Sequence, residues 1–192
     1  MDDVIVIVII FGSVFSFLIL VSTIQSRRSR QKWQKFADEL GLSFEGKNLL
    51  FRKSKIKGVY RKHSVLFDIY MENRTIFTQL NVDFENKKNI SFSIFHKKAF
   101  DKMGNLLGKE IRFEDNPQFD SKFTIRGNDE EFIKSVLDQS IQDRVLGLSK
   151  FNIIRIKDEK AYFREIGIIT DAERLKTVIE LLSDIIDMIE RD

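Results

Sequence analysis

The chain has 192 residues, with 32 lysines and arginines against 29 aspartates and glutamates, and a net charge of +3. Its 43% hydrophobic and 32% charged content is that of one folded domain with room for an appendage, and it excludes a disordered, a collagen-like and a polytopic membrane protein. The absence of cysteine excludes disulfide scaffolds, cysteine-ligated zinc, iron–sulfur clusters and thiol catalysis.

Residues 4–24 carry no charged side chain and are mostly apolar. At about 1.5 Å per residue, a helix of this length is roughly 31 Å long, which matches the hydrocarbon core of a bilayer. The run follows two acids, Asp2 and Asp3, and lacks the small-residue cleavage site of a signal peptide. We therefore predict an uncleaved anchor over 1–26, with a transmembrane helix at about 4–24 that contacts the lipid bilayer.

Basic residues follow the apolar run closely. They are Arg27, Arg28, Arg30, Lys32 and Lys35. Because basic flanks stay on the cytoplasmic side, we predict that the N-terminus lies outside the cell membrane and residues 27–192 lie in the cytoplasm. The five cations are the predicted contacts with the membrane surface, where anionic lipid head groups would attract them.

The next segment changes from helical to strand periodicity. One apolar stripe at helical spacing predicts a basic helix over 28–41. Its members are Trp33, Phe36, Ala37 and Leu40. Between 42 and 126 the apolar residues recur at every second position, which predicts mainly antiparallel strands joined by short turns. The shorter strand candidates include 48–52, and residues 97–109 are interpreted as a short helix or a loop.

The C-terminal part predicts two helices around a hairpin. Asn128 and Thr170 each precede a glutamate by three positions, a pattern typical of helix N-caps. We expect helix 129–146, hairpin 151–165 and helix 171–190. The apolar stripe of the last helix predicts packing on the sheet, and a coiled-coil dimer is the weaker alternative because the helix contains few heptads. The predicted fold is α+β: an N-terminal transmembrane helix, then an antiparallel β-sheet domain with helices packed on one face.

Few residues indicate chemistry. The two histidines, His63 and His96, lie at predicted strand ends beside basic residues, and we interpret them as solvated. Asp83 and Glu85 share a strand face, but no pattern predicts the desolvated pocket that a general acid needs. The outer acids of the last helix are interpreted as a solvated face: Glu180, Asp184, Asp187, Glu190 and Asp192. We assign no catalytic, cofactor-binding or metal-ligating residue and expect no cofactor.

These features favour a single-pass membrane protein that displays a non-catalytic cytoplasmic α+β domain, which would bind a protein partner or the membrane surface. A membrane-tethered hydrolase or transferase that uses carboxylates and a metal is the alternative, and it requires a concave pocket with convergent acids. A nucleic-acid binder acting through the basic segment 27–62 is a third hypothesis, and it predicts an affinity that falls steeply with salt.

Overall fold

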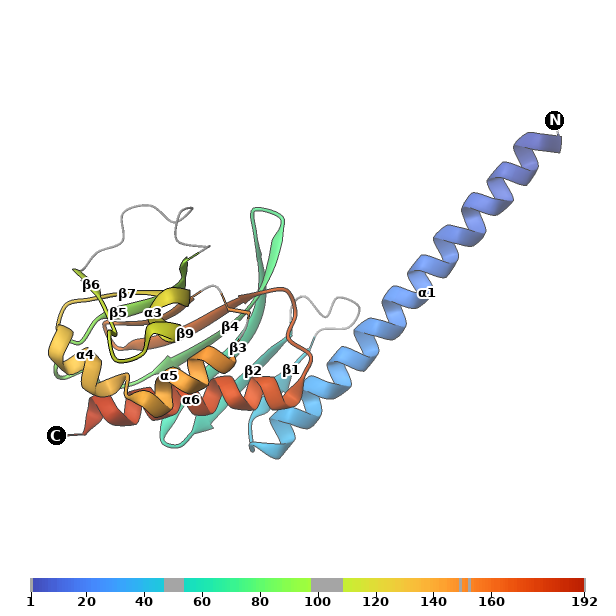
Figure 1. Cartoon of the computed structure of the whole chain (residues 1–192). Helices are drawn as coiled ribbons and strands as arrows, with labels where there is room; N and C mark the ends of the chain where they lie inside the picture. The colour runs from blue at the N-terminus through green and yellow to red at the C-terminus, as the bar shows by residue number, and fades with distance from the viewer. Residues whose placement is uncertain (1, 47–53, 98–108, 149, 152, 192) are drawn as a thin grey trace.

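A computed structural model describes residues 2–46, 54–97, 109–148, 150–151 and 153–191, with only the backbone described for 2–16, 18, 19 and 22. The fold is α+β, as predicted (Figure 1). The helices are α1 (Asp2–Glu39), α3 (Pro117–Lys122), α4 (Glu130–Val136), α5 (Gln139–Gly147) and α6 (Ala172–Glu190). The strands are β1 (Ser43–Glu45), β2 (Lys55–Tyr60), β3 (His63–Glu72), β4 (Thr75–Asp83), β5 (Phe92–His96), β6 (Lys109–Ile111), β7 (Phe123–Gly127), β8 (Ile153–Lys157) and β9 (Lys160–Ile166).

The described strands form one antiparallel sheet in the order β1-β2-β3-β4-β9-β8-β5-β7-β6. The first four strands follow chain order, because turns of two residues join β2 to β3 and β3 to β4. The hairpin predicted over 151–165 corresponds to β8 and β9, and it lies between β4 and β5. A late segment of the chain therefore connects the two halves of the sheet.

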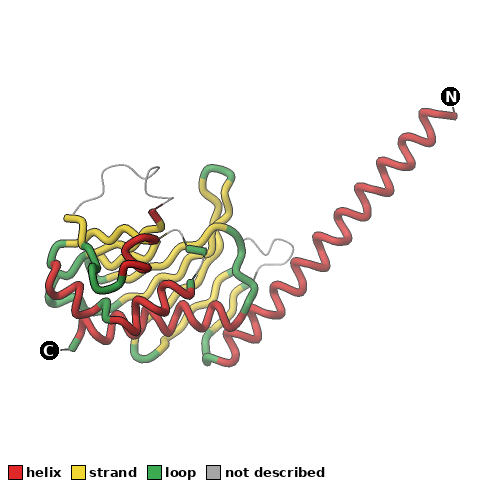
Figure 2. Tube along the Cα trace, viewed as in Figure 1, coloured by secondary structure: helices red, strands yellow, loops and turns green. Residues whose placement is uncertain are grey.

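Helices α4, α5 and α6 gather on one side of the sheet, and α6 crosses several strands (Figure 2). The apolar stripe of α6 is buried against β4 and β9, with α5 beside it. Its buried members include Leu175, Val178, Ile179, Leu182, Ile185, Ile186 and Ile189. This burial supports sheet packing as the use of the stripe, because a coiled coil would need the same residues.

Helix α1 runs unbroken from Asp2 to Glu39 and leaves the body of the protein, so that the N-terminus lies far from the sheet (Figure 1). Among its described side chains, those that join the core are in its last turns: Trp33, Phe36 and Ala37. Among the described residues, none of the helices is both long and apolar enough to cross a membrane. The structure thus gives no support to the transmembrane helix predicted over 4–24.

The single helix predicted over 129–146 is wrong, because α4 and α5 are separate helices. The break falls at Leu137 and Asp138, where the backbone leaves the helical region. Asp138 then caps α5 by accepting a hydrogen bond from the Ile141 N–H at 2.9 Å. An aspartate side chain competes with the helical backbone in this way, and the competition divides the helix.

Two predicted caps are also shifted by one residue. Asp129 and Asp171, rather than Asn128 and Thr170, cap α4 and α6. The Asn128 amide instead joins two segments, since it donates to the Asn89 carbonyl at 2.7 Å while its oxygen accepts from the Ser91 N–H. The predicted strand 48–52 and nearly all of segment 97–109 lie outside the described residues.

Candidate functional site

The end of α1 is fixed in the core by one buried indole. Trp33 is fully buried, and its Nε1–H donates to the Ile169 carbonyl at 2.7 Å. The Ile169 N–H in turn donates to the Thr78 hydroxyl on β4 at 2.9 Å. Trp33 therefore packs against the domain, which agrees with the apolar stripe in the sequence. It also holds α1 against the loop that precedes α6.

The five cations predicted to contact the membrane surface are all exposed on α1, between its buried end and its apolar run. Lys35 forms a weak surface pair with Glu39 at 3.7 Å, and the Arg30 guanidinium lies 6.0 Å from the Phe44 ring centre. Within the described chain, the other three have no carboxylate partner. None of the described residues neutralises these three charges.

A second charged site lies where the β2–β3 turn meets the end of α6. The turn residues Arg61 and Lys62 have left-handed φ values of 45° and 76°, an unfavourable conformation for side-chain-bearing residues. Their side chains reach α6, where Arg61 pairs with Asp184 and Lys62 pairs with Glu190 at 2.7 Å. Ion pairs with α6 thus offset part of the cost of the turn.

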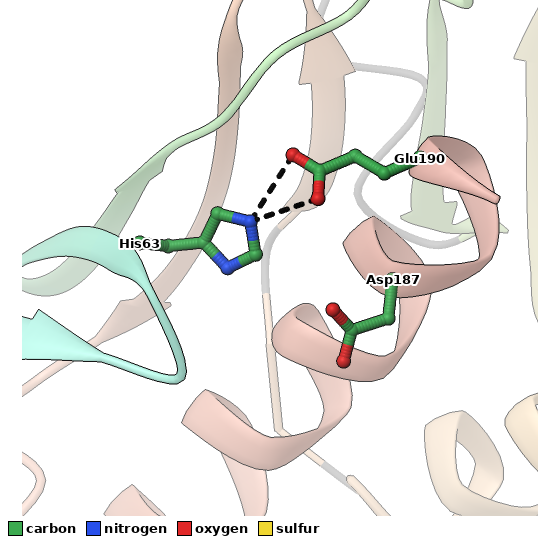
Figure 3. Close-up of side chains that lie close together, drawn as sticks. All are labelled: His63, Asp187 and Glu190. Carbon is green, nitrogen blue, oxygen red and sulfur yellow. Dashed lines mark hydrogen bonds and ion pairs between the residues drawn. The ribbon is translucent and has the colours of Figure 1, made fainter.

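His63 begins β3 directly after this turn and is only 5% exposed. Its Nε2 lies 3.1 Å from each carboxylate oxygen of Glu190, and Asp187 lies one helical turn earlier on α6 (Figure 3). Glu190 also accepts from the Glu85 N–H at 3.2 Å. The interpretations of His63 as solvated, and of the α6 acids as a solvated face, are therefore wrong at this site.

The electrostatics of the helix explain the arrangement. The last turn of α6 has no basic residue, so Asp187 and Glu190 sit at the negative end of the helix dipole without local compensation. Burial alone would raise the pKa of Glu190, but hydrogen bonds from Lys62, the Glu85 N–H and His63 outweigh it and lower that pKa. The turn supplies the positive charge that the helix lacks.

Asp184 is held in the same manner from two sides. Burial works to raise its pKa, but hydrogen bonds from Arg61 on the turn and Arg144 on α5 prevail and lower it. Asp184 therefore joins three elements of the fold through one carboxylate. We call the group Arg61, Lys62, His63, Asp184, Asp187 and Glu190 the α6 clasp.

Part of the α6 clasp resembles a set of metal ligands, because donor atoms of His63, Asp187 and Glu190 lie within 4.8 Å of one another. Two observations count against this use. Lys62 and Arg61 already pair with the two carboxylates, Arg61 reaching Asp187 at 3.5 Å. A metal on Nε2 would place the histidine proton on Nδ1, which is buried and has no hydrogen-bond acceptor. The residues fit an ion-pair cluster better than a metal centre.

A pocket of about 470 Å³ adjoins the α6 clasp. Asp83 and Glu85 line it together with His63 and Glu190, so the chain does have the concavity that the sequence did not predict. Asp83 ends β4 and Glu85 lies beyond it, so the two acids do not share a strand face as expected. Both face lysines, since Lys160 lies 3.8 Å from Asp83 and Lys87 lies 3.1 Å from Glu85. The wall of the pocket is thus lined by compensated charges.

His96 lies far from this pocket. It ends β5, which three strands separate from β3, so about 19 Å of sheet lies between the two histidine-bearing strands. Its ring is half-buried and packs 4.8 Å from the Phe123 ring and 5.6 Å from the Phe151 ring, measured between centres. The two histidines do not form a common site, and the interpretation of His96 as solvated is also wrong.

The basic segment 27–62 is divided between separate places in the fold. Its first cations lie on α1, Lys57 pairs with Glu45 at 2.5 Å, and Arg61 and Lys62 belong to the α6 clasp. A nucleic-acid groove needs cations and aromatic rings along one surface. In the described part of this segment, Arg30 lies over the Phe44 ring and Arg61 over the Tyr60 ring. The later cations Lys57, Arg61 and Lys62 pair with carboxylates of the protein, so they do not offer free charge to a nucleic acid.

The sequence matches no known protein family and no curated protein. The fold is similar to a solved structure, the crystal structure of the mycobacterial trehalose monomycolate transport factor A, TtfA. The TM-score is 0.57 at 11% sequence identity, and the match covers 85% of this chain and 96% of that one. At this identity the likeness concerns the fold alone.

Sequence reasoning missed the α6 clasp for a clear reason. His63 and Glu190 are 127 positions apart, and the pairing depends on how α6 crosses the sheet. The one local signal is the pair of acids near the C-terminal end of a helix, where they oppose the helix dipole. Such acids need cations from elsewhere in the fold, and the sequence does not say from where.

Proposed function

We propose that this protein is a membrane-associated, non-catalytic interaction module, whose α+β domain is presented to a protein partner at the membrane surface by α1. The observation that carries the proposal is the continuity of α1. One helix contains the apolar run, the unpaired cations and the indole buried in the core. The orientation of the domain is therefore tied to whatever holds the apolar run.

The apolar run is the proposed membrane segment. Phe17, Leu20 and Ile24 are 63, 57 and 41% exposed, and they recur at helical spacing along one side of α1. Apolar side chains exposed in a row on a helix indicate a partner surface or lipid. The length and the lack of charge over 4–24 favour a bilayer, and this part of the proposal rests on the sequence.

The orientation follows from the basic residues. Arg27, Arg28, Arg30, Lys32 and Lys35 come directly after the apolar run. By the positive-inside rule they would hold residues 27–192 in the cytoplasm and leave the N-terminus outside. The likeness of the fold to a transport factor is compatible with a role in which the domain binds other proteins rather than converting a substrate.

A charge-reversal experiment tests attachment and orientation. Changing the five cations of α1 to glutamate should invert or abolish the orientation, as measured by protease protection of the domain in sealed vesicles. The matched control reverses five exposed domain lysines, Lys55, Lys97, Lys122, Lys157 and Lys176, and should leave protection unchanged. Release of the unmodified chain from membranes by alkaline carbonate would refute the membrane segment.

Cross-linking in native membranes tests the interaction role. A protein cross-linked through the domain of the full-length chain supports the module. The enzyme alternative is favoured by one observation, the pocket beside His63 and Glu190. It predicts that a substrate analogue or a divalent cation stabilises the wild-type chain and not the His63→Ala variant. That result, without a cross-linked protein, would replace the first proposal with the second.

A further inference from the structure

The cations of α1 are not spread evenly around the helix. A surface groove of about 540 Å³ runs along α1, and its described walls are Arg27, Arg30, Gln31, Gln34, Lys35 and Asp38. These positions recur at intervals of three and four and therefore share one face of the helix. Arg28 and Lys32 do not line the groove, although they carry the same charge and are also exposed.

The chemistry of the groove is that of an anion site. Three cations and two side-chain amides offer N–H donors, and arginine in particular matches phosphate oxygens in a bidentate manner. The one acid, Asp38, accepts a hydrogen bond from the Gln34 amide at 2.8 Å. Arg27 and Arg30 have no carboxylate partner within the described chain, so their charges are not cancelled locally.

The groove is also polarised along the helix axis. Arg27 lies about 4.5 Å and Arg30 about 9 Å beyond Ile24, whereas Asp38 lies roughly 21 Å beyond it. The head-group layer of a bilayer is about 5–8 Å thick on each side, and helical side chains lean toward the N-terminus. With the apolar run in the bilayer as proposed, the cationic end of the groove would face the head groups, and the acid would lie beyond them.

We propose that this groove is a binding site for the phosphate of an anionic phospholipid, with Arg27 and Arg30 as its main ligands. The inference rests on the proposed function and deepens it, because it assigns head-group recognition to one face of α1 rather than to the five cations together. Gln31 and Gln34 add neutral donors, and Lys35 adds charge at the outer end. Arg28 and Lys32 contribute only to the positive electrostatic potential around α1.

The test compares two variants with the same loss of charge. Arg27→Gln/Arg30→Gln removes the groove cations, and Arg28→Gln/Lys32→Gln removes the cations outside it. The full-length chain in detergent micelles is given phosphatidylglycerol or phosphatidylcholine, and bound lipid is counted by native mass spectrometry. We expect the phosphatidylglycerol-bound fraction to fall at least fivefold in the first variant and less than twofold in the second, with phosphatidylcholine binding unchanged in both.

Three results would overturn the inference. Equal losses in the two variants would mean that attraction is diffuse. Undiminished binding in the Arg27/Arg30 variant would mean that the groove is not the site. Displacement of phosphatidylglycerol by equimolar glycerol 3-phosphate would mean that free phosphate compounds, rather than lipids, are the ligand. None of these would refute membrane attachment, which the carbonate extraction tests separately.

Discussion

The cations of α1 and the carboxylates at the end of α6 differ in whether the protein supplies their counter-charges. Arg27 and Arg30 stand on an exposed helix face without a carboxylate partner in the described chain. Glu190 accepts from Lys62, His63 and a backbone N–H, and Asp184 accepts from two arginines. The two regions carry opposite charges, and the described residues pair the carboxylates but leave these two cations without a carboxylate partner.

The difference distinguishes charges that stabilise the fold from charges that remain free to bind an external partner. Carboxylates that are part-buried must be paired, since an unpaired one would lose its hydration without compensation. Cations that remain in water have no such requirement, and a protein can leave them for an external anion. The α6 clasp is accordingly interpreted as a part of the fold and the α1 face as a contact surface.

The largest loss of stability is expected from removing the contact between α1 and the loop that precedes α6. Trp33→Ala removes a fully buried indole and its hydrogen bond to Ile169, just before α6. The free energy of unfolding should fall by about 3–5 kcal/mol, as for other large-to-small core changes. Urea unfolding measures it, and the exposed neighbour Lys32→Ala is the control. A loss under 1 kcal/mol would show that α1 is not seated in the core.

A smaller effect is expected from unpairing the α6 clasp. Glu190→Gln keeps the shape of the side chain but weakens its bonds to Lys62 and His63, and should cost about 1–3 kcal/mol. Glu180→Gln makes the same change on the same helix, where Glu180 has no ion-pair partner within the described chain, and should stay within about 0.5 kcal/mol. Equal unfolding free energies for the two variants would contradict the structural role of the α6 clasp.

The pH dependence of stability tests the α6 clasp through a second carboxylate, Asp184. The pKa of Asp184 is lowered from its ordinary value of 3.8 in the folded protein, so its stabilising contribution is present above that value. It is lost as the pH falls through the folded pKa. Asp184→Asn should cost about 1 kcal/mol at neutral pH, and the difference from wild type should shrink as the pH falls below 3.8 and vanish only below the lowered pKa of the folded state.

Urea titrations at a series of pH values measure this difference. A guanidinium does not lose its proton in this pH range, so any change in the difference reports on the carboxylate. A difference that persists unchanged into strong acid would mean that Asp184 contributes by packing rather than by its charge.

The smallest effect is expected on α1. Arg27→Gln/Arg30→Gln should alter the free energy of unfolding by less than about 1 kcal/mol, because within the described chain no carboxylate depends on these cations and Arg30 contacts only the Phe44 ring, from an exposed position. Raising the salt concentration should change the stability of this variant and of wild type equally. A loss above 1 kcal/mol would reveal an internal partner, and it would remove the contrast between the two regions.

Local patterns predicted much of the architecture. The alternation through β3 and β4 indicated a hairpin with one apolar face, and the residues Val65, Phe67, Leu80 and Val82 are indeed buried. The stripe of α6 was equally clear, because its period of 3.6 residues is a direct consequence of helix geometry. The break between α4 and α5 was missed, since a single aspartate that caps a new helix interrupts the apolar stripe only slightly.

The two candidate sites also differ in how much of each could be predicted from the sequence. The sequence by itself determined the position of the α1 cations, because they follow the apolar run in the chain and an exposed helix preserves that order in space. Only the tertiary structure decided which of them line the groove and that His63 is buried against Glu190. Pairings over 127 positions arise from how α6 crosses the sheet, and packing of the whole core fixes that crossing.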